Sequence, residues 1–286
     1  MFDFILIAAL WGGSFLFMRA AVPEFGPIAL IAVRVAIAAA FLAPFAWAKE
    51  GTSGARANWK SILFVGASNY ALPFCLLAYA TLHVTAGFAS ILNSTAPLFT
   101  ALVGWLWLKD RLSRVQLLGL ILGFSGVVIL SWGKLSFDHG DGLAIAAALC
   151  ATFLYGVATH FTKCFMMGMS PLSLTAWGLA AAAVMLAPLG IWAAPPVNPS
   201  PMAWGSVIAL GLACTALAFY LFFGLLAKWG ATRTIAVGFL IPVFGMLWGR
   251  IFLGEVVTLR MVLGTAIIIA GTSLTSGLLS TSSPAR

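Results

Sequence analysis

Charged residues are scarce in this sequence. Only 8% of its 286 residues are Asp, Glu, Lys or Arg, whereas soluble globular proteins carry about 25%. Hydrophobic residues make up 62% of the chain, and the mean hydropathy is +1.08. The composition therefore excludes a water-soluble enzyme and indicates a protein that lies within a membrane.

The sequence also lacks the alternating segments of about 10 residues that are typical of outer-membrane barrels. Its uncharged runs are continuous and reach the length of about 20 residues that a helix needs to cross a bilayer. They predict an all-α integral membrane protein with ten transmembrane helices, at residues 3–21, 27–48, 61–80, 84–107, 114–132, 142–162, 170–193, 203–226, 232–252 and 258–279.

Catalytic and metal-binding motifs are missing as well. The sequence has no HExxH, no GxSxG and no cluster of carboxylates. Free cysteines inside a protein behave as small hydrophobes, and those of this chain lie in or at the ends of predicted helices: Cys75, Cys150, Cys164 and Cys214. We therefore expect no enzyme activity, no cofactor and no metal site.

Basic side chains are distributed unevenly between the predicted connections. Lys and Arg concentrate on the cytoplasmic side of membrane proteins. With a cytoplasmic N-terminus, the inside holds Lys49, Arg56, Lys60, Lys109, Arg111, Arg114, Lys163, Lys228, Arg233 and Arg286. The outside then holds only Arg19, Lys134, Arg250 and Arg260. This bias predicts that both termini are cytoplasmic, and it ascribes the net charge of +8 to topology and lipid contact rather than to nucleic-acid binding.

The two halves of the sequence resemble each other. A shift of 145 residues aligns Pro97 with Pro242, Gly104 with Gly249, Gly119 with Gly264 and Gly126 with Gly271, and a shift of 144 aligns Pro27 with Pro171. Such matches indicate a duplication, here of five helices, in residues 1–134 and 135–286. Because five is odd, the second copy must enter the membrane from the opposite side. Inverted repeats are typical of transporters, with the substrate site near the midplane between the halves.

Pro97 and Pro242 occupy equivalent positions inside predicted helices. Proline removes a helical hydrogen bond and here frees the carbonyl groups of Asn93 and Gly238. Within a membrane such groups are tolerated only toward protein or a wet cavity, so we expect the two prolines to act as hinges beside a central cavity. Ser90 and Asn93 share a helix face with Pro97. That face either lines the cavity or hydrogen-bonds neighbouring helices, and the sequence leaves both interpretations open.

Several motifs together resemble a known family. They are Trp11-Gly12 with Phe15, Arg34, the run from Pro97 to Gly126 that includes Asp110-Arg111, and in the second half Pro242, Gly254-Glu255, Gly264 and Gly271. These residues resemble the EamA-type ten-helix exporters of the drug/metabolite transporter superfamily, and the chain is most similar to bacterial amino-acid exporters of the YddG type. The resemblance covers nearly the whole chain, but Lys109 stands where the family usually has glycine.

The resemblance implies a multi-pass protein of the bacterial inner membrane and a cavity lined by helices 1, 3, 4, 6, 8 and 9. It implies substrate contacts from Trp11, Tyr79, His83, Ser90, Asn93, Tyr155, His160, Tyr220 and Gly238. Aromatic faces in a cavity can stack on apolar groups or attract an ammonium group. The alternative is that these side chains pack between helices, or that the histidines are satisfied structural groups. Glycine spacings such as Gly119 to Gly123 predict close helix packing within a monomer.

Arg34 is the one basic residue deep inside a predicted helix, where a charge is expensive. We expect a structural role, in which it pairs with helix-end carbonyls or Glu24, with binding of a substrate carboxylate as the alternative. No Asp or Glu lies inside a predicted helix, although proton-coupled drug antiporters typically need one. These features predict broad-specificity export of neutral amino acids, including aromatic ones, by alternating access. The alternative is export of drugs or cationic metabolites.

Overall fold

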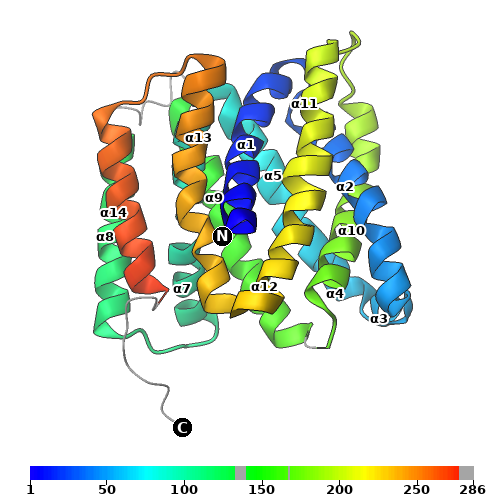
Figure 1. Cartoon of the computed structure of the whole chain (residues 1–286), viewed down its shortest axis with the longest axis horizontal. Helices are drawn as coiled ribbons and strands as arrows, with labels where there is room; N and C mark the ends of the chain where they lie inside the picture. Colours follow the sequence, from blue (N-terminus) through cyan, green and yellow to red (C-terminus); the bar gives the residue numbers. More distant parts are fainter. Residues whose placement is uncertain (133–139, 167, 277–286) are drawn as a thin grey trace.

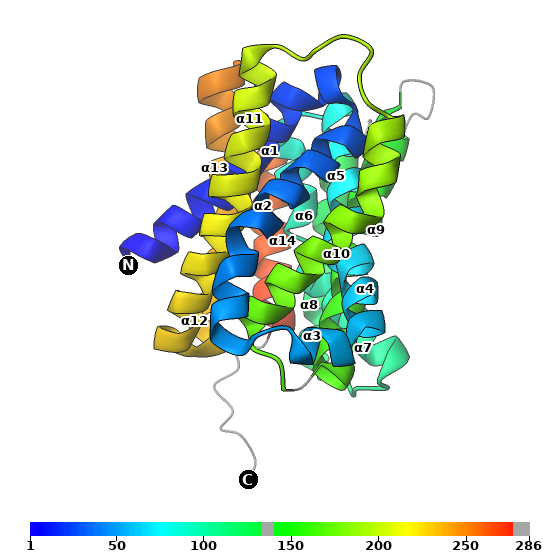
Figure 2. The same ribbon diagram turned by 90° about the vertical axis from the view of Figure 1, so that its right-hand side faces the viewer.

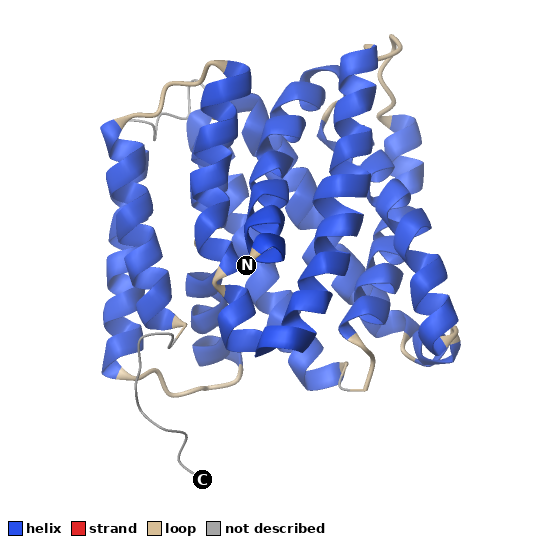
Figure 3. Cartoon of the chain, in the orientation of Figure 1, coloured by secondary structure: helices blue, strands red, loops and turns tan. Residues whose placement is uncertain are grey.

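The structure is a computed structural model that describes residues 1–132, 140–166 and 168–276. Its regular elements in these ranges are helices (Figure 3). The first half contains α1 (Phe2–Phe25), α2 (Pro27–Glu50), α3 (Ser53–Ala57), α4 (Trp59–Val65), the π-helical segment η1 (Gly66–Ala71), α5 (Leu72–His83), α6 (Ala86–Asn93), α7 (Ala96–Trp107) and α8 (Arg114–Ser131). The second half contains α9 (Asp141–Phe165), α10 (Pro171–Trp192), α11 (Pro201–Gly211), the π-helical segment η2 (Leu212–Leu217), α12 (Ala218–Ile235), α13 (Val237–Leu253) and α14 (Leu259–Thr275).

These elements form the predicted membrane-spanning segments. Within the described ranges, nine helical stretches are long and apolar enough to cross a membrane, and α14 is a shorter apolar helix. The third segment combines α4, η1 and α5, the fourth is split into α6 and α7, and the eighth combines α11, η2 and most of α12. The predicted boundary at residue 134, and the end of the predicted helix 258–279 beyond residue 276, lie outside the described residues.

Corresponding helices of the two halves run in opposite directions. In Figure 1, α1 and α8 rise toward the top of the view, whereas their counterparts α9 and α14 descend. The halves pack against each other through equivalent helices, α8 with α14 and α2 with α10, and Figure 2 shows α2 beside α10. The fold is therefore an inverted repeat of two five-helix units around a central cavity.

Local geometry is duplicated along with the helices. Each half has a π-helical segment at the same place, η1 in the first and η2 in the second. The backbone N–H of Asp110 donates to the carbonyl of Gly104 at 3.2 Å, and that of Glu255 donates to the carbonyl of Gly249 at 3.1 Å. Lys109 has a φ of 55° and its counterpart Gly254 a φ of 66°. Lys109 thus keeps the left-handed conformation that glycine adopts without steric cost.

Glycines allow the close packing of α8 on α14. A Cβ atom added to Gly271 would lie 2.6 Å from the Cα of Gly123 and 2.7 Å from the carbonyl oxygen of Gly119, so backbone meets backbone at this contact. Gly126 packs against the side chain of Ile268, 2.8 Å from where its Cβ would stand. Small residues at a helix interface permit such close approach, and these glycines form contacts within the chain.

Candidate functional site

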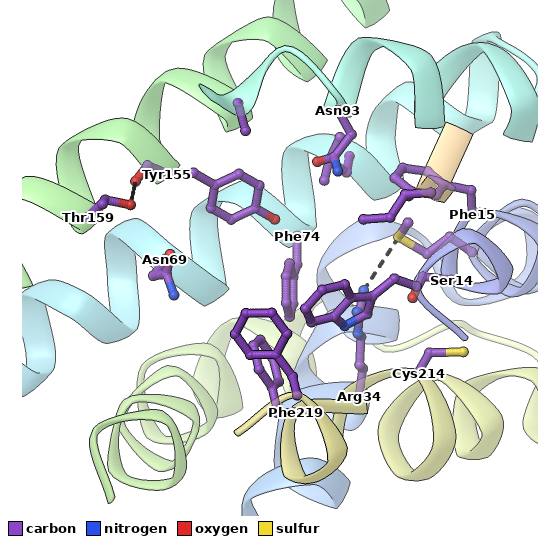
Figure 4. A pocket seen from close by; sticks show the side chains of 16 residues that line it. Ser14, Phe15, Arg34, Asn69, Phe74, Asn93, Tyr155, Thr159, Cys214 and Phe219 are labelled. Atoms are coloured by element: carbon purple, nitrogen blue, oxygen red, sulfur yellow. Dashed lines mark hydrogen bonds between the residues drawn. The ribbon is translucent and has the colours of Figure 1, made fainter. Parts of the chain in front are cut away.

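A cavity of about 430 Å³ lies between the two halves. Its walls come from both repeats, because α1, α2, η1, α5, α6 and α7 contribute side chains together with α9, η2, α12 and α13. The lining residues are Trp11, Ser14, Phe15, Met18, Arg34, Asn69, Phe74, Leu77, Asn93, Ala96, Tyr155, Thr159, Cys214, Phe219, Phe222 and Ile241. Figure 4 shows how these side chains converge. The lining is thus mostly apolar, with six aromatic side chains and a few polar groups.

Aromatic rings from opposite repeats meet at one wall. The ring centroid of Trp11, on α1, lies 5.7 Å from that of Phe219 and 5.1 Å from that of Phe222, both on α12. Tyr155 extends from α9 into the cavity, with its hydroxyl on the side of Asn93 and Phe74 (Figure 4). Such rings offer faces for an apolar side chain and for a cation.

Asn93 stands where the chain breaks between α6 and α7. At this break the hydroxyls of Ser94 and Thr95 donate to backbone carbonyls three residues earlier, at 2.6 and 2.7 Å. Pro97, in the first turn of α7, lacks the N–H that would bond the Asn93 carbonyl. Within the described structure, the side-chain oxygen of Asn93 is buried and has no hydrogen-bond partner. A buried acceptor without a donor is costly, so this oxygen is available to an N–H group of a ligand.

The two predicted hinge prolines have different settings. Pro97 lies directly after the break between α6 and α7. Pro242 lies inside α13, which is continuous from Val237 to Leu253. The interruptions in that part of the second half are instead at Gly230, with φ 75° and ψ 170°, and at Ala236.

Arg34 projects from the middle of α2 into the cavity and is only 4% exposed. Its Nε donates to the hydroxyl oxygen of Thr215 at 3.0 Å, and its Nη1 lies 3.6 Å from the sulfur of Met18. The guanidinium stands over the ring of Phe74, 3.9 Å from the centroid. One long side chain thus brings a positive charge from α2 to the cavity wall.

The structure corrects the expected pairing of Arg34. Its hydrogen-bond partners in the described structure are Thr215 and Met18, and neither Glu24 nor a helix-end carbonyl is among them. Glu24 instead accepts hydrogen bonds from the backbone N–H and the hydroxyl of Ser200, at 2.6 and 2.8 Å. That carboxylate therefore caps α11 at one end of the bundle, and the cavity keeps an arginine without a carboxylate neighbour.

Of the residues expected to contact substrate, the structure brings Trp11, Asn93 and Tyr155 to the cavity. Ser90 is fully buried, donates to the carbonyl of Gly87 at 2.7 Å and packs against Gly245. His160 lies 2.8 Å from the carbonyl oxygen of Thr100 through its Nε2. These two polar groups therefore serve contacts between helices.

The remaining expected contacts also lie away from the cavity lining. Tyr220 is 49% exposed on the outer surface, where its ring packs on Phe45. The rings of Tyr79 and His83 pack on each other, with centroids 5.0 Å apart. A Cβ atom added to Gly238 would meet nothing within 4 Å.

Other lining residues were not identified from the sequence as cavity residues. They are Ser14, Met18, Asn69, Phe74, Leu77, Ala96, Thr159, Cys214, Phe219, Phe222 and Ile241. Asn69 and Phe219 lie in or next to the π-helical segments, which alter the face that a helix presents. The polar residues Asn69 and Thr159, each inside an apolar helix, are the signal that could have been used.

Beside the cavity, α1, α6 and α13 are packed together. Gly12 of α1 packs directly against Phe244 and Gly245 of α13. The carboxylate of Glu255, which follows α13, accepts hydrogen bonds from the first backbone N–H groups of α6, 2.7 Å from Ala86 and 3.2 Å from Gly87. Unpaired N–H groups at a helix N-terminus favour an anion, so Glu255 fastens the end of α6 to the loop after α13.

Comparisons with known proteins agree with this architecture. An uncharacterized transporter of Archaeoglobus fulgidus is 26% identical over 269 residues, covering 93% of this chain and 94% of the relative. A probable terminal-alkyne amino-acid exporter of Streptantibioticus cattleyicolor is 27% identical over 279 residues, covering 94% of this chain and 91% of the relative. A solved structure titled "Crystal structure of protein" matches with a TM-score of 0.67 at 20% identity, covering 96% of this chain and 94% of its own, which shows a shared fold.

The family comparison matches each half of the chain separately. The EamA-like transporter family matches residues 2–132 and again residues 142–277. The two matches correspond to the two five-helix units that the structure places in opposite orientations. The chain therefore belongs to the EamA-like transporter family.

Proposed function

We infer that this chain exports neutral amino acids, including aromatic ones, by alternating access through the central cavity. One observation supports this most strongly: an aromatic cavity between inverted repeats that also contains the unpartnered side-chain oxygen of Asn93. The aromatic walls suit an apolar side chain, and an ammonium group can bind both an aromatic face and a carbonyl-type oxygen. A relative named as a probable amino-acid exporter is in keeping with this substrate class.

The distribution of basic residues supports an orientation of the protein in the membrane. Lys49, Arg56 and Arg114 belong to the end of the bundle where α2 ends and α8 begins, and this end becomes cytoplasmic under the positive-inside rule. Both termini then lie on the cytoplasmic side of a bacterial inner membrane. The end of the bundle that holds Glu255 then faces outward, and we infer from the bonds between Glu255 and α6 that it is the closed end. Export requires this end to open while the opposite end closes, with the break between α6 and α7 as one hinge.

Counterflow in proteoliposomes tests the proposal. Liposomes that contain the purified protein and unlabelled phenylalanine are expected to accumulate external labelled phenylalanine at zero pH gradient, because exchange through an alternating site needs no coupling ion. Liposomes without protein are the control. Accumulation only under an imposed pH gradient would contradict uncoupled exchange. Exchange of quaternary amines and dyes without exchange of amino acids would favour the drug-exporter alternative.

A further inference from the structure

Arg34 is held in place but not neutralised by the protein. Among the described residues, no Asp or Glu pairs with its guanidinium, and its Nη2 has no hydrogen-bond partner. A methionine sulfur is a weak acceptor, so most of the five N–H donors of this side chain are unused. Because arginine keeps its charge in proteins, the cavity wall holds a buried cation that no protein anion balances.

Neighbouring groups fix the direction of the guanidinium. The hydroxyl of Thr215 accepts from Nε and itself donates to the carbonyl of Leu210 at 2.7 Å, which is five residues back across the π-helical turn of η2. The ring of Phe74 covers one face of the guanidinium. With Nε bonded to Thr215, one face against Phe74 and Nη1 against the weak acceptor Met18, Nη2 is free for a ligand, and Nη1 can join it when the Met18 contact is given up.

The inverted repeat shows that the fold does not require a charge here. The shift of 144 residues that aligns Pro27 with Pro171 also aligns Arg34 with Gly178 of α10. Beside Gly178 the space is filled by the ring of Tyr70, from η1 of the first half, 2.8 Å from where a Cβ of Gly178 would stand. The hydroxyl of Tyr70 donates to Thr175 at 3.2 Å. An aromatic ring and a neutral hydrogen bond thus join α10 to η1, whereas a cation joins α2 to η2.

We propose that Arg34 binds the carboxylate of the transported molecule, and that the site therefore selects carboxylates over amines. The inference rests on the proposed function and specifies its substrate class. A guanidinium fork matches a carboxylate with two parallel hydrogen bonds. A carboxylate would supply the missing counter-charge, and a substrate cation would be repelled. In the same cavity the free oxygen of Asn93 and the ring of Tyr155 can receive an ammonium group, so an amino acid satisfies both kinds of site.

Analogues that carry only one of the two charged groups test this selectivity in the unmodified protein. Competition against labelled phenylalanine is measured in the counterflow assay with 3-phenylpropionate, which keeps the carboxylate, and with phenethylamine, which keeps the ammonium group. The acid is expected to compete at least about 10-fold more strongly, because a charged hydrogen-bond pair is lost with the amine. Equal competition, or stronger competition by the amine, would overturn the proposal. Because this experiment uses the unmodified protein, its result does not depend on whether a variant folds.

Variants of Arg34 supply the second arm. Arg34→Gln is expected to raise the KM for phenylalanine at least about 30-fold and to abolish the preference for the acid over the amine. Arg34→Lys keeps the charge without the fork. Its KM for phenylalanine and its preference for the acid should lie between those of the parent and of Arg34→Gln. Arg260→Gln is the matched control, because Arg260 donates to the carbonyl of Trp132 at an exposed site, and it should leave KM and preference unchanged. An Arg34→Gln protein with the parental KM and preference would refute the carboxylate site.

The two proposals fail in different ways. If phenylalanine does not exchange but labelled 3-phenylpropionate does, and this exchange depends on Arg34, the amino-acid assignment fails and the carboxylate site stands. If phenylalanine exchanges equally well with and without Arg34, the carboxylate site fails and the proposed function stands.

Discussion

Replacing Glu255 with alanine is expected to open the end of the cavity that this carboxylate closes. The change removes two hydrogen bonds that the N-terminal N–H groups of α6 donate to this carboxylate, an effect of about 2 kcal/mol. Such a change in free energy shifts the balance between closed and open forms by roughly 30-fold. A thiol introduced by Ala96→Cys in the cavity lining should then react faster with a membrane-impermeant reagent applied to the side of Glu255.

Two matched variants give this experiment its controls. Glu255→Gln keeps an acceptor oxygen but loses the charge, so the reaction should accelerate less than with alanine. Asp110→Asn changes the equivalent acidic residue at the opposite end of the bundle and should not accelerate labelling from the side of Glu255. A labelling rate in Glu255→Ala that equals the parental rate would show that this contact does not hold the end shut.

Gly271→Ala is expected to destabilise the protein by about 3 kcal/mol, because overpacking here cannot be relieved by moving a side chain. The three atoms nearest to the added methyl group all belong to the backbone of α8, including the Cα of Gly123 at 2.6 Å. The helices α8 and α14 would have to separate along their interface. Thermal unfolding in detergent measures the effect as a lower midpoint.

Gly224→Ala in α12 is the control for this substitution, because an added Cβ there would meet nothing within 4 Å. Alanine favours a helix over glycine by about 1 kcal/mol, so this variant should be as stable as the parent or slightly more so. If the unfolding midpoint of Gly271→Ala equals that of Gly224→Ala, the close contact between α8 and α14 does not contribute to stability.

The fold could be predicted from the sequence because two simple signals determine it. Uncharged runs of the length of a bilayer specify membrane helices, and paired prolines and glycines such as Pro97 with Pro242 reveal the inverted repeat. The π-helical segments η1 and η2 gave no such signal. They depend on one extra residue in a turn, which hydrophobic composition does not report.

The site was predictable only in part. The sequence shows how deep in the membrane a side chain lies, but it does not show whether that side chain points toward the cavity or away from it. Trp11, Asn93 and Tyr155 line the cavity, whereas Tyr220 has a similar depth but points outward and is 49% exposed. The rotation of α12 follows from η2 and from its packing, which the sequence pattern does not contain. The sequence places Arg34 deep inside a helix but does not show where its side chain ends. Its long side chain nevertheless reaches the cavity lining.

If the central cavity is the route of transport, blocking it must stop exchange, and a single thiol in its lining tests this most directly. In a variant with Ala96→Cys and the four native cysteines replaced, phenylalanine exchange is measured before and after complete reaction with a bulky thiol reagent. We predict that the reaction abolishes exchange and that phenylalanine present during the reaction slows it. Exchange that continues at its original rate after every introduced thiol has reacted would contradict the account.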